Sequence, residues 1–202
     1  MRVAYREIAE KGFEGLRTRQ IAGAVGVNVA TLHYYFPTKE DLIRAVVGHA
    51  MSRFQETLRA DGTALERLRG HFQGLRRLAR TEPELFAAMA ELTLRASRDR
   101  RLASVIEKTN AYWDKTMRSL LRQARDEGAL PSTTDPGGMA TVVVAALKGG
   151  FMLPGPTTEG FDRTVRELER ILGLREGVPL SEAAPRSARA RSGGVSAPRS
   201  RT

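Results

Sequence analysis

The chain has 202 residues, with 33 Lys and Arg against 23 Asp and Glu, a formal net charge of +10 and no Cys. The missing cysteine excludes disulfide scaffolds, thiol nucleophiles and zinc sites that contain Cys. No apolar run approaches the roughly 20 residues of a membrane-spanning helix, and the first residues lack the pattern of a signal peptide, so we expect a cytoplasmic protein without membrane contact.

Hydrophobic periodicity predicts an all-α protein. Apolar residues recur at intervals of three and four along almost the whole chain, and no segment shows the sustained alternation of a β-strand. Glycine and proline interrupt this pattern often enough to divide it into about nine helices. The expected breaks are Gly12, Gly26, Pro37, Asp61-Gly62, Glu82-Pro83, Gly128, Pro131 to Pro136, Pro154 to Pro156 and Gly173.

Residues 12–42 read GFEGLRTRQIAGAVGVNVATLHYYFPTKEDL, and this segment predicts a helix-turn-helix. A short helix over 18–25 ends at Gly26, which supplies the turn, and Asn28 is suited to cap a second helix. Pro37 stops that helix after about nine residues, or roughly 13 Å. An element of this length fits the major groove of DNA, which is about 12 Å wide.

The two faces of the second helix differ in chemistry. At 100° per residue, we expect Leu32, Tyr35 and Phe36 to face the protein. The opposite side carries His33 and Tyr34, whose polar tips can hydrogen-bond to DNA, behind small residues that can approach thymine methyl groups. The alternative is that these rings fill a helical core, as aromatic residues usually do. Because His33 and Tyr34 lie away from Leu32 and Phe36, DNA contact is the favoured interpretation.

The stretch GLRTRQIAGAVG, followed by VNVATLHYYFPTKEDL, resembles the DNA-binding domain of the TetR family of bacterial regulators over about residues 3–47. The resemblance implies a homodimeric transcription factor, most often a repressor, that binds double-stranded operator DNA and responds to a small-molecule effector. It also implies that Arg19 reaches a base edge and Thr18 a phosphate. The residues expected to bind DNA are Arg17, Thr18, Arg19, Asn28, Val29, Ala30, Thr31, His33, Tyr34 and Lys39.

Three departures from the family pattern limit what the resemblance implies. Arg17 stands where the family usually has a small helix-capping residue, so we expect that cap to be lost. His33 replaces the usual tyrosine at its position. The first helix lacks the opening apolar turn and basic arm common in the family, which would place the natural start of the chain upstream.

Four longer helices are expected over 39–59, 63–80, 82–97 and 100–127, each with an inward apolar stripe. The Thr-x-x-acid sequences that begin at Thr38 and Thr63 have the spacing of capping boxes. In the resembling family such helices enclose an effector cavity, and ordinary core packing is the alternative for every candidate. The candidate lining residues are His71, Phe86, Met89, Thr93, Asn110, Tyr112, Trp113, Met117 and Phe151.

Residues 139–153 are apolar except for Thr141 and Lys148, so they are too short to span a bilayer and too apolar for an exposed helix. A second apolar stripe follows within 161–172. In the resembling family the last two helices pair with their symmetry mates in a homodimer, and packing within one chain is the alternative. The expected domains are 1–47 for DNA binding, 48–174 for effector binding and dimerisation, and 175–202 as a disordered basic tail.

The sequence offers no support for catalysis or for a cofactor. His33, His49 and His71 are 16 and 22 residues apart, without the spacing of a helical metal site. No Gly-x-Ser-x-Gly motif is present, and GPTTEG lacks the Lys and Ser/Thr that would complete a phosphate loop. We therefore expect neither an enzyme nor a bound metal or cofactor. The competing hypothesis is a helical small-molecule or protein-interaction module without specific DNA binding.

Overall fold

The computed structural model describes residues 1–152 and 157–174, which form nine α-helices and contain no β-strand. The predicted all-α architecture is confirmed, whereas the expected tail, 175–202, lies outside the described residues. The helices are α1 (Arg2–Gly15), α2 (Thr18–Val25), α3 (Val29–Tyr35), α4 (Lys39–Gln55), α5 (Ala64–Thr81), α6 (Pro83–Ala96), α7 (Arg100–Asp126), α8 (Pro136–Met152) and α9 (Thr157–Ile171).

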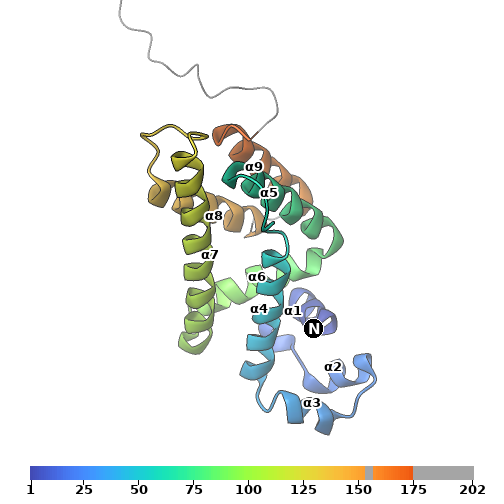
Figure 1. The fold of residues 1–202 in the computed structure, drawn as a ribbon. Helices are drawn as coiled ribbons and strands as arrows, with labels where there is room; N and C mark the ends of the chain where they lie inside the picture. Colours follow the sequence, from blue (N-terminus) through green and yellow to red (C-terminus); the bar gives the residue numbers. More distant parts are fainter. Residues whose placement is uncertain (153–156, 175–202) are drawn as a thin grey trace, which may run out of the picture.

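The helices are arranged between two ends of the molecule, with α2 and α3 at one end and α5 and α9 at the other (Figure 1). α4 leads from α3 into the larger group of helices, in which α8 packs against both α7 and α9. The expected domain boundary between residues 47 and 48 falls inside α4. A single continuous helix therefore runs through both expected domains.

Local side-chain contacts explain where several helices begin. The Thr38 hydroxyl accepts from the amide of Asp41 at 3.1 Å, and the Asp41 carboxylate accepts from the amide of Thr38 at 3.2 Å. Thr63 and Glu66 make the same reciprocal pair at the start of α5, so both predicted capping boxes are confirmed. Asp135 accepts from two amides at the start of α8, at 2.9 and 3.0 Å.

The core contains a row of aromatic rings contributed by four different helices. The ring centroid of Phe54 in α4 lies 5.3 Å from that of Phe86 in α6, which lies 4.5 Å from that of Phe151 in α8. Phe151 in turn lies 4.4 Å from Phe161 in α9. Ring pairs at such distances stabilise a fold by about 0.5–1.5 kcal/mol beyond their buried area. The position of α4 is therefore tied to α6 and α8.

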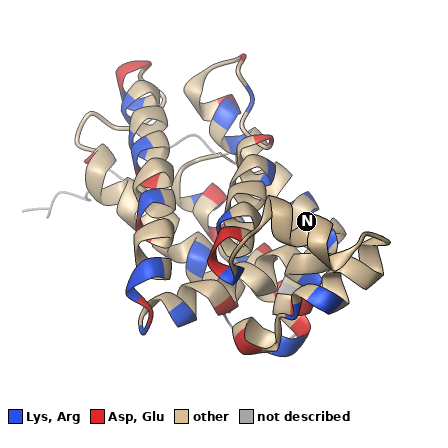
Figure 2. Ribbon diagram, turned by 90° about the horizontal axis from the view of Figure 1, so that it is seen from below, with Lys and Arg blue, Asp and Glu red and all other residues tan. Residues whose placement is uncertain are grey.

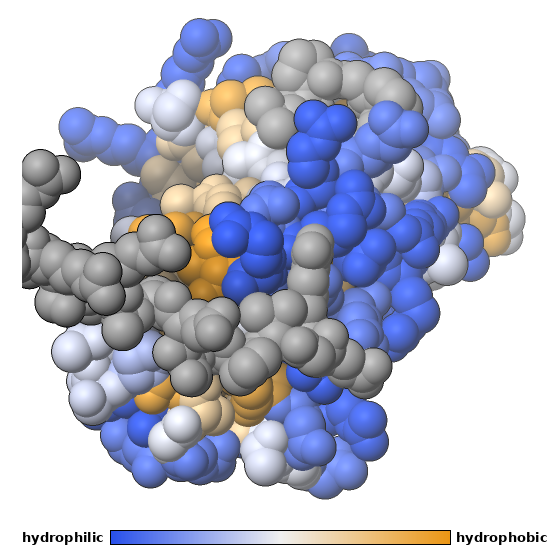
Figure 3. Space-filling view, turned by 90° about the horizontal axis from the view of Figure 1, so that it is seen from above, coloured by the Kyte–Doolittle hydropathy of each residue, from blue (hydrophilic) through white to orange (hydrophobic). Residues whose placement is uncertain are grey.

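The last two helices leave apolar and small residues on the surface. Val142 is 54% exposed and Ile171 is 49% exposed, and the exposed stripe of α8 also contains Ala145 and Gly149. Seen from the α9 end, the surface is mostly hydrophilic with separate hydrophobic patches (Figure 3). No helix among the described residues combines the length and apolar composition needed to cross a bilayer.

Candidate nucleic-acid interface and internal cavity

The turn between α2 and α3 has the predicted helix-turn-helix geometry. Gly26 adopts a left-handed conformation with φ of 75°, which residues with a Cβ rarely adopt, and it ends α2. The Asn28 side chain accepts from the amide of Ala30 at 2.9 Å and caps α3, as predicted. α3 ends before Pro37, so the expected short second helix is confirmed.

The exposed face of α3 carries the two aromatic residues that follow His33. Leu32 is the residue of α3 that is buried, whereas Tyr34 is 81% exposed and His33 is exposed. The expectation for Tyr35 is wrong, because its side chain is 68% exposed and its ring meets that of Tyr34 edge-on, with centroids 5.3 Å apart. Three positions after Leu32, the Tyr35 side chain is turned about 60° from it, which takes it off the narrow packed face.

The remaining candidate DNA-binding residues lie at the exposed ends of α2, α3 and α4. Arg17 precedes α2 without any side-chain cap, as expected, and its guanidinium donates to the carbonyl of Glu14. Lys39 begins α4 with its ammonium 4.3 Å from the centre of the Phe13 ring, and burial lowers its pKa. Thr18 and Val29 are partly exposed, and the fully exposed positions are Arg19, Ala30 and Thr31.

Charge at this end of the molecule is mixed. Viewed from the α3 end, Lys and Arg are interspersed with Asp and Glu and do not form one continuous basic surface (Figure 2). A general attraction to phosphate would require clustered cations. The shape and side chains of α3 are therefore the distinctive feature of this end.

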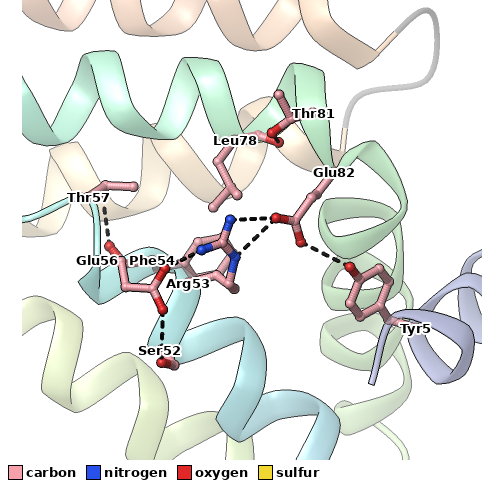
Figure 4. A network of polar contacts seen from close by, with 9 residues as sticks. All are labelled: Tyr5, Ser52, Arg53, Phe54, Glu56, Thr57, Leu78, Thr81 and Glu82. Carbon is pink, nitrogen blue, oxygen red and sulfur yellow. Dashed lines mark hydrogen bonds and ion pairs between the residues drawn. The ribbon is translucent and has the colours of Figure 1, made fainter.

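A polar network around Glu82 joins the helix-turn-helix to the rest of the molecule (Figure 4). The Tyr5 hydroxyl of α1 donates to Glu82 at 2.9 Å, and Arg53 of α4 donates to the other carboxylate oxygen at 3.0 and 2.6 Å. Burial raises the pKa of Glu82, but the hydrogen bonds from Arg53 and Tyr5 outweigh it and leave the pKa below its ordinary value. Glu82 is therefore held as a carboxylate that links α1, α4 and the start of α6.

α6 contacts α1 at further points along its length, among them an ion pair between Arg6 and Glu84 at 3.8 Å. Glu91 accepts from the amide of Phe13 at 3.2 Å, and Arg95 forms an ion pair with Glu14 at 2.7 Å. The Arg95 guanidinium also lies 4.9 Å from the centre of the Phe13 ring. α6 therefore holds α1 directly, while its opposite side faces the interior.

A small cavity of about 40 Å³ lies between α4, α6, α7 and α8. Its walls are aromatic and aliphatic, with hydroxyl, amide and ammonium groups among them. Lys148 is the charged residue among its lining residues, and it is half-buried. The lining residues are Met51, Phe54, Met89, Ala90, Thr93, Ile106, Thr109, Asn110, Trp113, Lys148, Phe151 and Met152.

The structure brings together five of the nine residues proposed for an effector cavity. The five that line it are Met89, Thr93, Asn110, Trp113 and Phe151. Phe86 is buried behind the cavity and contacts Phe151, whereas Met117 is fully buried and does not line it. Sequence reasoning did not select Lys148, although a charge inside the apolar run 139–153 was a visible signal.

The other two candidates, His71 and Tyr112, line a neighbouring cavity of about 10 Å³. His71 is buried, and both ring nitrogens already have protein partners. The Trp113 indole donates to Nε2 at 3.4 Å, and Nδ1 lies 2.6 Å from the hydroxyl of Thr57, which donates to the carbonyl of Phe54 at 2.7 Å. Because Nε2 must accept from the indole, Nδ1 carries the hydrogen and donates to Thr57. Burial lowers the pKa of His71 to about 3, so the ring is neutral.

Comparison with known protein families gives two matches at different parts of the chain. Residues 1–46 match the family described as bacterial regulatory proteins, tetR family. Residues 64–155 match the family described as BetI-type transcriptional repressor, C-terminal. The first match covers α1 to α3 and the start of α4, and the second covers α5 to α8.

Two curated relatives are named nucleoid occlusion factor SlmA. The protein from Mannheimia succiniciproducens is 27% identical over 176 residues, which span 81% of this chain and 80% of that protein. A protein from Haemophilus influenzae is 31% identical over 81 residues, which span 38% of this chain and 37% of that protein.

Solved structures share the fold. A TetR transcription regulator from Haloarcula marismortui superposes with a TM-score of 0.73 at 21% identity, covering 84% of this chain and 92% of that one. A protein from Saccharomonospora viridis in complex with choline gives 0.70 at 22% identity, covering 84% and 91%. AibR, in complex with isovaleryl coenzyme A and operator DNA, gives 0.61 at 20% identity, covering 83% and 97%.

The helix-turn-helix, the helical group around a cavity and the two family matches agree with one another. Together they identify the chain as a member of the TetR family of bacterial DNA-binding transcriptional regulators.

Proposed function

We propose that this chain is a repressor that binds a near-palindromic operator as a homodimer and is released by a small-molecule effector. The observation that carries the proposal is a short helix anchored by Leu32 that displays His33 and Tyr34 to solvent. In this proposal residues 1–47 bind DNA, and residues 48–174 bind the effector and form the dimer. Two copies of α3 would enter major grooves about 34 Å apart, or a multiple of that distance.

The proposed DNA contacts divide into base-reading and phosphate-binding groups. Tyr34 and the small residues of α3 are placed for base edges, and Arg19 for a base edge from α2. Exposed cations and hydroxyls at helix starts are placed for phosphates, where backbone amides add to the attraction. The residues proposed to bind phosphates are Arg17, Thr18, Asn28, His33 and Lys39. The residues proposed to read bases are Arg19, Val29, Ala30, Thr31 and Tyr34.

The exposed stripe of α8, together with Ile171 of α9, is the proposed dimer surface. Val142 of this stripe is more than half exposed, and its neighbours Ala145 and Gly149 are small enough to let a second helix approach closely. A two-fold axis brings the same patch of both copies together, so each exposed apolar residue of the patch becomes buried in both copies. Replacing Val142 by Glu should convert the dimer to a monomer in analytical ultracentrifugation, whereas Glu at the charged, exposed position of Arg163 should not.

The cavity is the proposed effector site, and two of its walls lead to the DNA-binding end. α4 carries Met51 and Phe54 in the cavity wall and continues directly to the helix-turn-helix. α6 carries Met89 in the wall and holds α1 through Glu91. A ligand that enlarges the cavity would therefore favour a conformer in which the two α3 helices are spaced differently. The shift in the equilibrium between the two conformers equals the difference in the free energy with which the ligand binds them.

Relatives show that this fold accepts different ligands. The solved neighbours contain choline in one case and isovaleryl coenzyme A with operator DNA in another. We infer a small-molecule effector for this chain as well, and a regulator of this kind would act at the nucleoid in the cytoplasm. We propose that the chain acts by binding and not as an enzyme, in line with its two matches to families of regulators. Among the described residues no group of three or more His, Cys, Asp or Glu could hold a metal ion.

Selection of bound duplexes from a random pool, with the purified full chain and at two salt concentrations, tests the proposal. A repressor enriches a near-palindromic sequence at both concentrations, and that sequence should lie beside genes whose expression rises when the chain is deleted. The competing hypothesis, a helical interaction module, predicts no enriched sequence. Binding that disappears uniformly at the higher salt would also contradict specific recognition.

A further inference from the structure

We propose that the cavity binds an amphipathic carboxylate, whose charged group pairs with Lys148 while its apolar tail lies against the aromatic wall formed by Phe54, Trp113 and Phe151. The inference rests on the proposed effector site and assigns it a ligand class. It is carried by the position of one cation in an otherwise uncharged cavity.

Lys148 has no partner among residues 1–152 and 157–174. Its ammonium makes no hydrogen bond or ion pair within the described part of the chain, and the residues around it in α8 are apolar or small. A cation withdrawn from water without a counter-charge is unfavourable, and proteins usually pair such groups. Burial accordingly lowers the pKa of Lys148, and no charged neighbour contributes to the shift. A ligand anion would supply the missing charge.

The charges and the hydrogen-bond donors of the lining residues exclude other classes of ligand. None of its lining residues is acidic, so a cationic ligand would meet Lys148 without any carboxylate to balance the two positive charges. The hydroxyls of Thr93 and Thr109 already donate to carbonyls of their own helices, at 2.7 and 3.0 Å. The indole of Trp113 donates to His71.

Only two side-chain donors of the lining remain, the ammonium of Lys148 and the amide of Asn110. Two donors with one positive charge match the two oxygens and single charge of a carboxylate. A phosphate group, which carries more charge and more acceptor oxygens, is usually held by several cations or backbone amides. The donor set therefore favours the monoanion.

The tail of the ligand must be apolar, and the cavity must widen to hold it. A volume of about 40 Å³ is far below the roughly 300 Å³ or more of an occupied ligand pocket. Three of the lining side chains are the flexible methionines Met51, Met89 and Met152, which can repack around a guest. Because Met51 belongs to α4, a ligand that displaces it acts on the helix that leads to the DNA-binding end.

Trp113 provides a direct readout, because it is the single tryptophan of the chain and lines the cavity. The experiment titrates the purified full chain with three probes that share an eight-carbon chain: octanoate, 1-octanol and octyltrimethylammonium. We expect octanoate to change the fluorescence with an affinity at least about tenfold higher than the other two, since a charge-assisted hydrogen bond contributes about 1.5–3 kcal/mol.

Variants decide whether Lys148 is responsible. Lys148→Met should reduce octanoate affinity about tenfold or more, Lys148→Arg should retain most of it, and the exposed control Lys115→Met should bind like the parent protein. Thermal unfolding should show that Lys148→Met is folded and at least as stable as the parent, because it removes a half-buried charge. The affinity of the parent protein for octanoate should also fall as pH rises through the pKa of Lys148. Among the residues that line the cavity from the four helices, Lys148 is the one that titrates.

A second experiment separates this inference from the proposed function. It uses fluorescence anisotropy to measure whether the same probes release the selected operator duplex from the protein. Release by octanol or by the ammonium probe, undiminished in Lys148→Met, would overturn the carboxylate while leaving effector control intact. Octanoate binding that depends on Lys148 but does not release DNA would support the site and contradict its regulatory role. No binding of octanoate, or equal binding of all three probes, would overturn the inference.

Discussion

The hydroxyl of Tyr5 donates a 2.9 Å hydrogen bond to the carboxylate of Glu82, although 77 residues separate the two along the chain. Tyr5 belongs to the first helix of the DNA-binding end, whereas Glu82 precedes α6 and also accepts from Arg53 of α4. Glu82 is thus the point at which α1, α4 and the start of α6 meet. Its contacts define how rigidly the helix-turn-helix is attached.

Removing the Tyr5 hydroxyl should loosen that attachment. Tyr5→Phe should lower the free energy of unfolding by about 0.5–1.5 kcal/mol, the contribution of one hydrogen bond. Glu82→Gln should lower it by more, because Arg53 then keeps only the carboxylate of Glu56 as a charged partner. Denaturant titration of both variants and the double variant measures the coupling between the two residues. Additive effects would show that the strength of the hydrogen bond does not depend on the charge of Glu82, because the amide oxygen of Gln can still accept it.

Tyr34→Ala should weaken binding to the selected operator by about 1–3 kcal/mol and relax its preference at one base step, because Tyr34 is placed to read bases. Lys39→Gln should weaken binding to every duplex alike and reduce the salt slope by about one, as expected for one phosphate contact. The measurement is a set of anisotropy titrations on operator and scrambled duplexes. Since Tyr34 is 81% exposed, its replacement should leave the melting temperature unchanged. An unaltered operator preference in Tyr34→Ala would remove Tyr34 from the recognition surface.

Stability should depend on pH through His71. Its pKa is about 3 in the folded chain, against an ordinary 6.5, so between these values the unfolded chain binds a proton that the folded chain does not. Stability is therefore lost as pH falls below about 6.5, by about 2 kcal/mol at pH 5. His71→Gln replaces the ring by an amide that does not titrate between pH 5 and pH 7. Denaturant titrations of the parent protein and this variant at both pH values therefore isolate the contribution of His71. Parallel losses in the two proteins would show that His71 titrates normally.

Gly74 of α5 should resist substitution, because a Cβ there would lie 2.6 Å from the Cβ of Thr57. Gly74→Ala should lower the free energy of unfolding by about 1–3 kcal/mol through overpacking. Gly48 of α4 is the matched control, since a Cβ there meets nothing within 4 Å. Gly48→Ala should raise the stability by about 0.5–1 kcal/mol through helix propensity alone. Thermal and denaturant unfolding compare the two variants, and equal shifts would refute the close approach of α5 to Thr57.

Some features of the molecule could be predicted because they depend on residues close together in the chain. The left-handed turn at Gly26, the cap at Asn28 and the capping boxes that begin at Thr38 and Thr63 each involve atoms within a few residues of one another. Their spacing alone specifies the contacts, and the structure has them where they were predicted. The order and type of the helices follow from the same local signals.

Other features could not be predicted because they depend on which distant element covers a given side chain. Helix periodicity places Tyr35 on the inner face, yet its side chain is 68% exposed in the structure. His71 and Asn110 were equivalent polar candidates in sequence, but His71 is engaged by Thr57 and Trp113, while Asn110 faces the cavity. Burial and hydrogen-bond satisfaction are properties of the assembled helices.

By itself the sequence determined an all-α chain with a helix-turn-helix near its start, since helix periodicity, caps and turns are short-range effects. Only the tertiary structure decided which cavity residues meet, that Glu82 joins α1 to α4, and that Lys148 lies beside an aromatic wall without a partner in the described part of the chain. Those relationships are set by packing between helices far apart in the chain. Packing depends on the whole arrangement of side chains, and no local pattern encodes it.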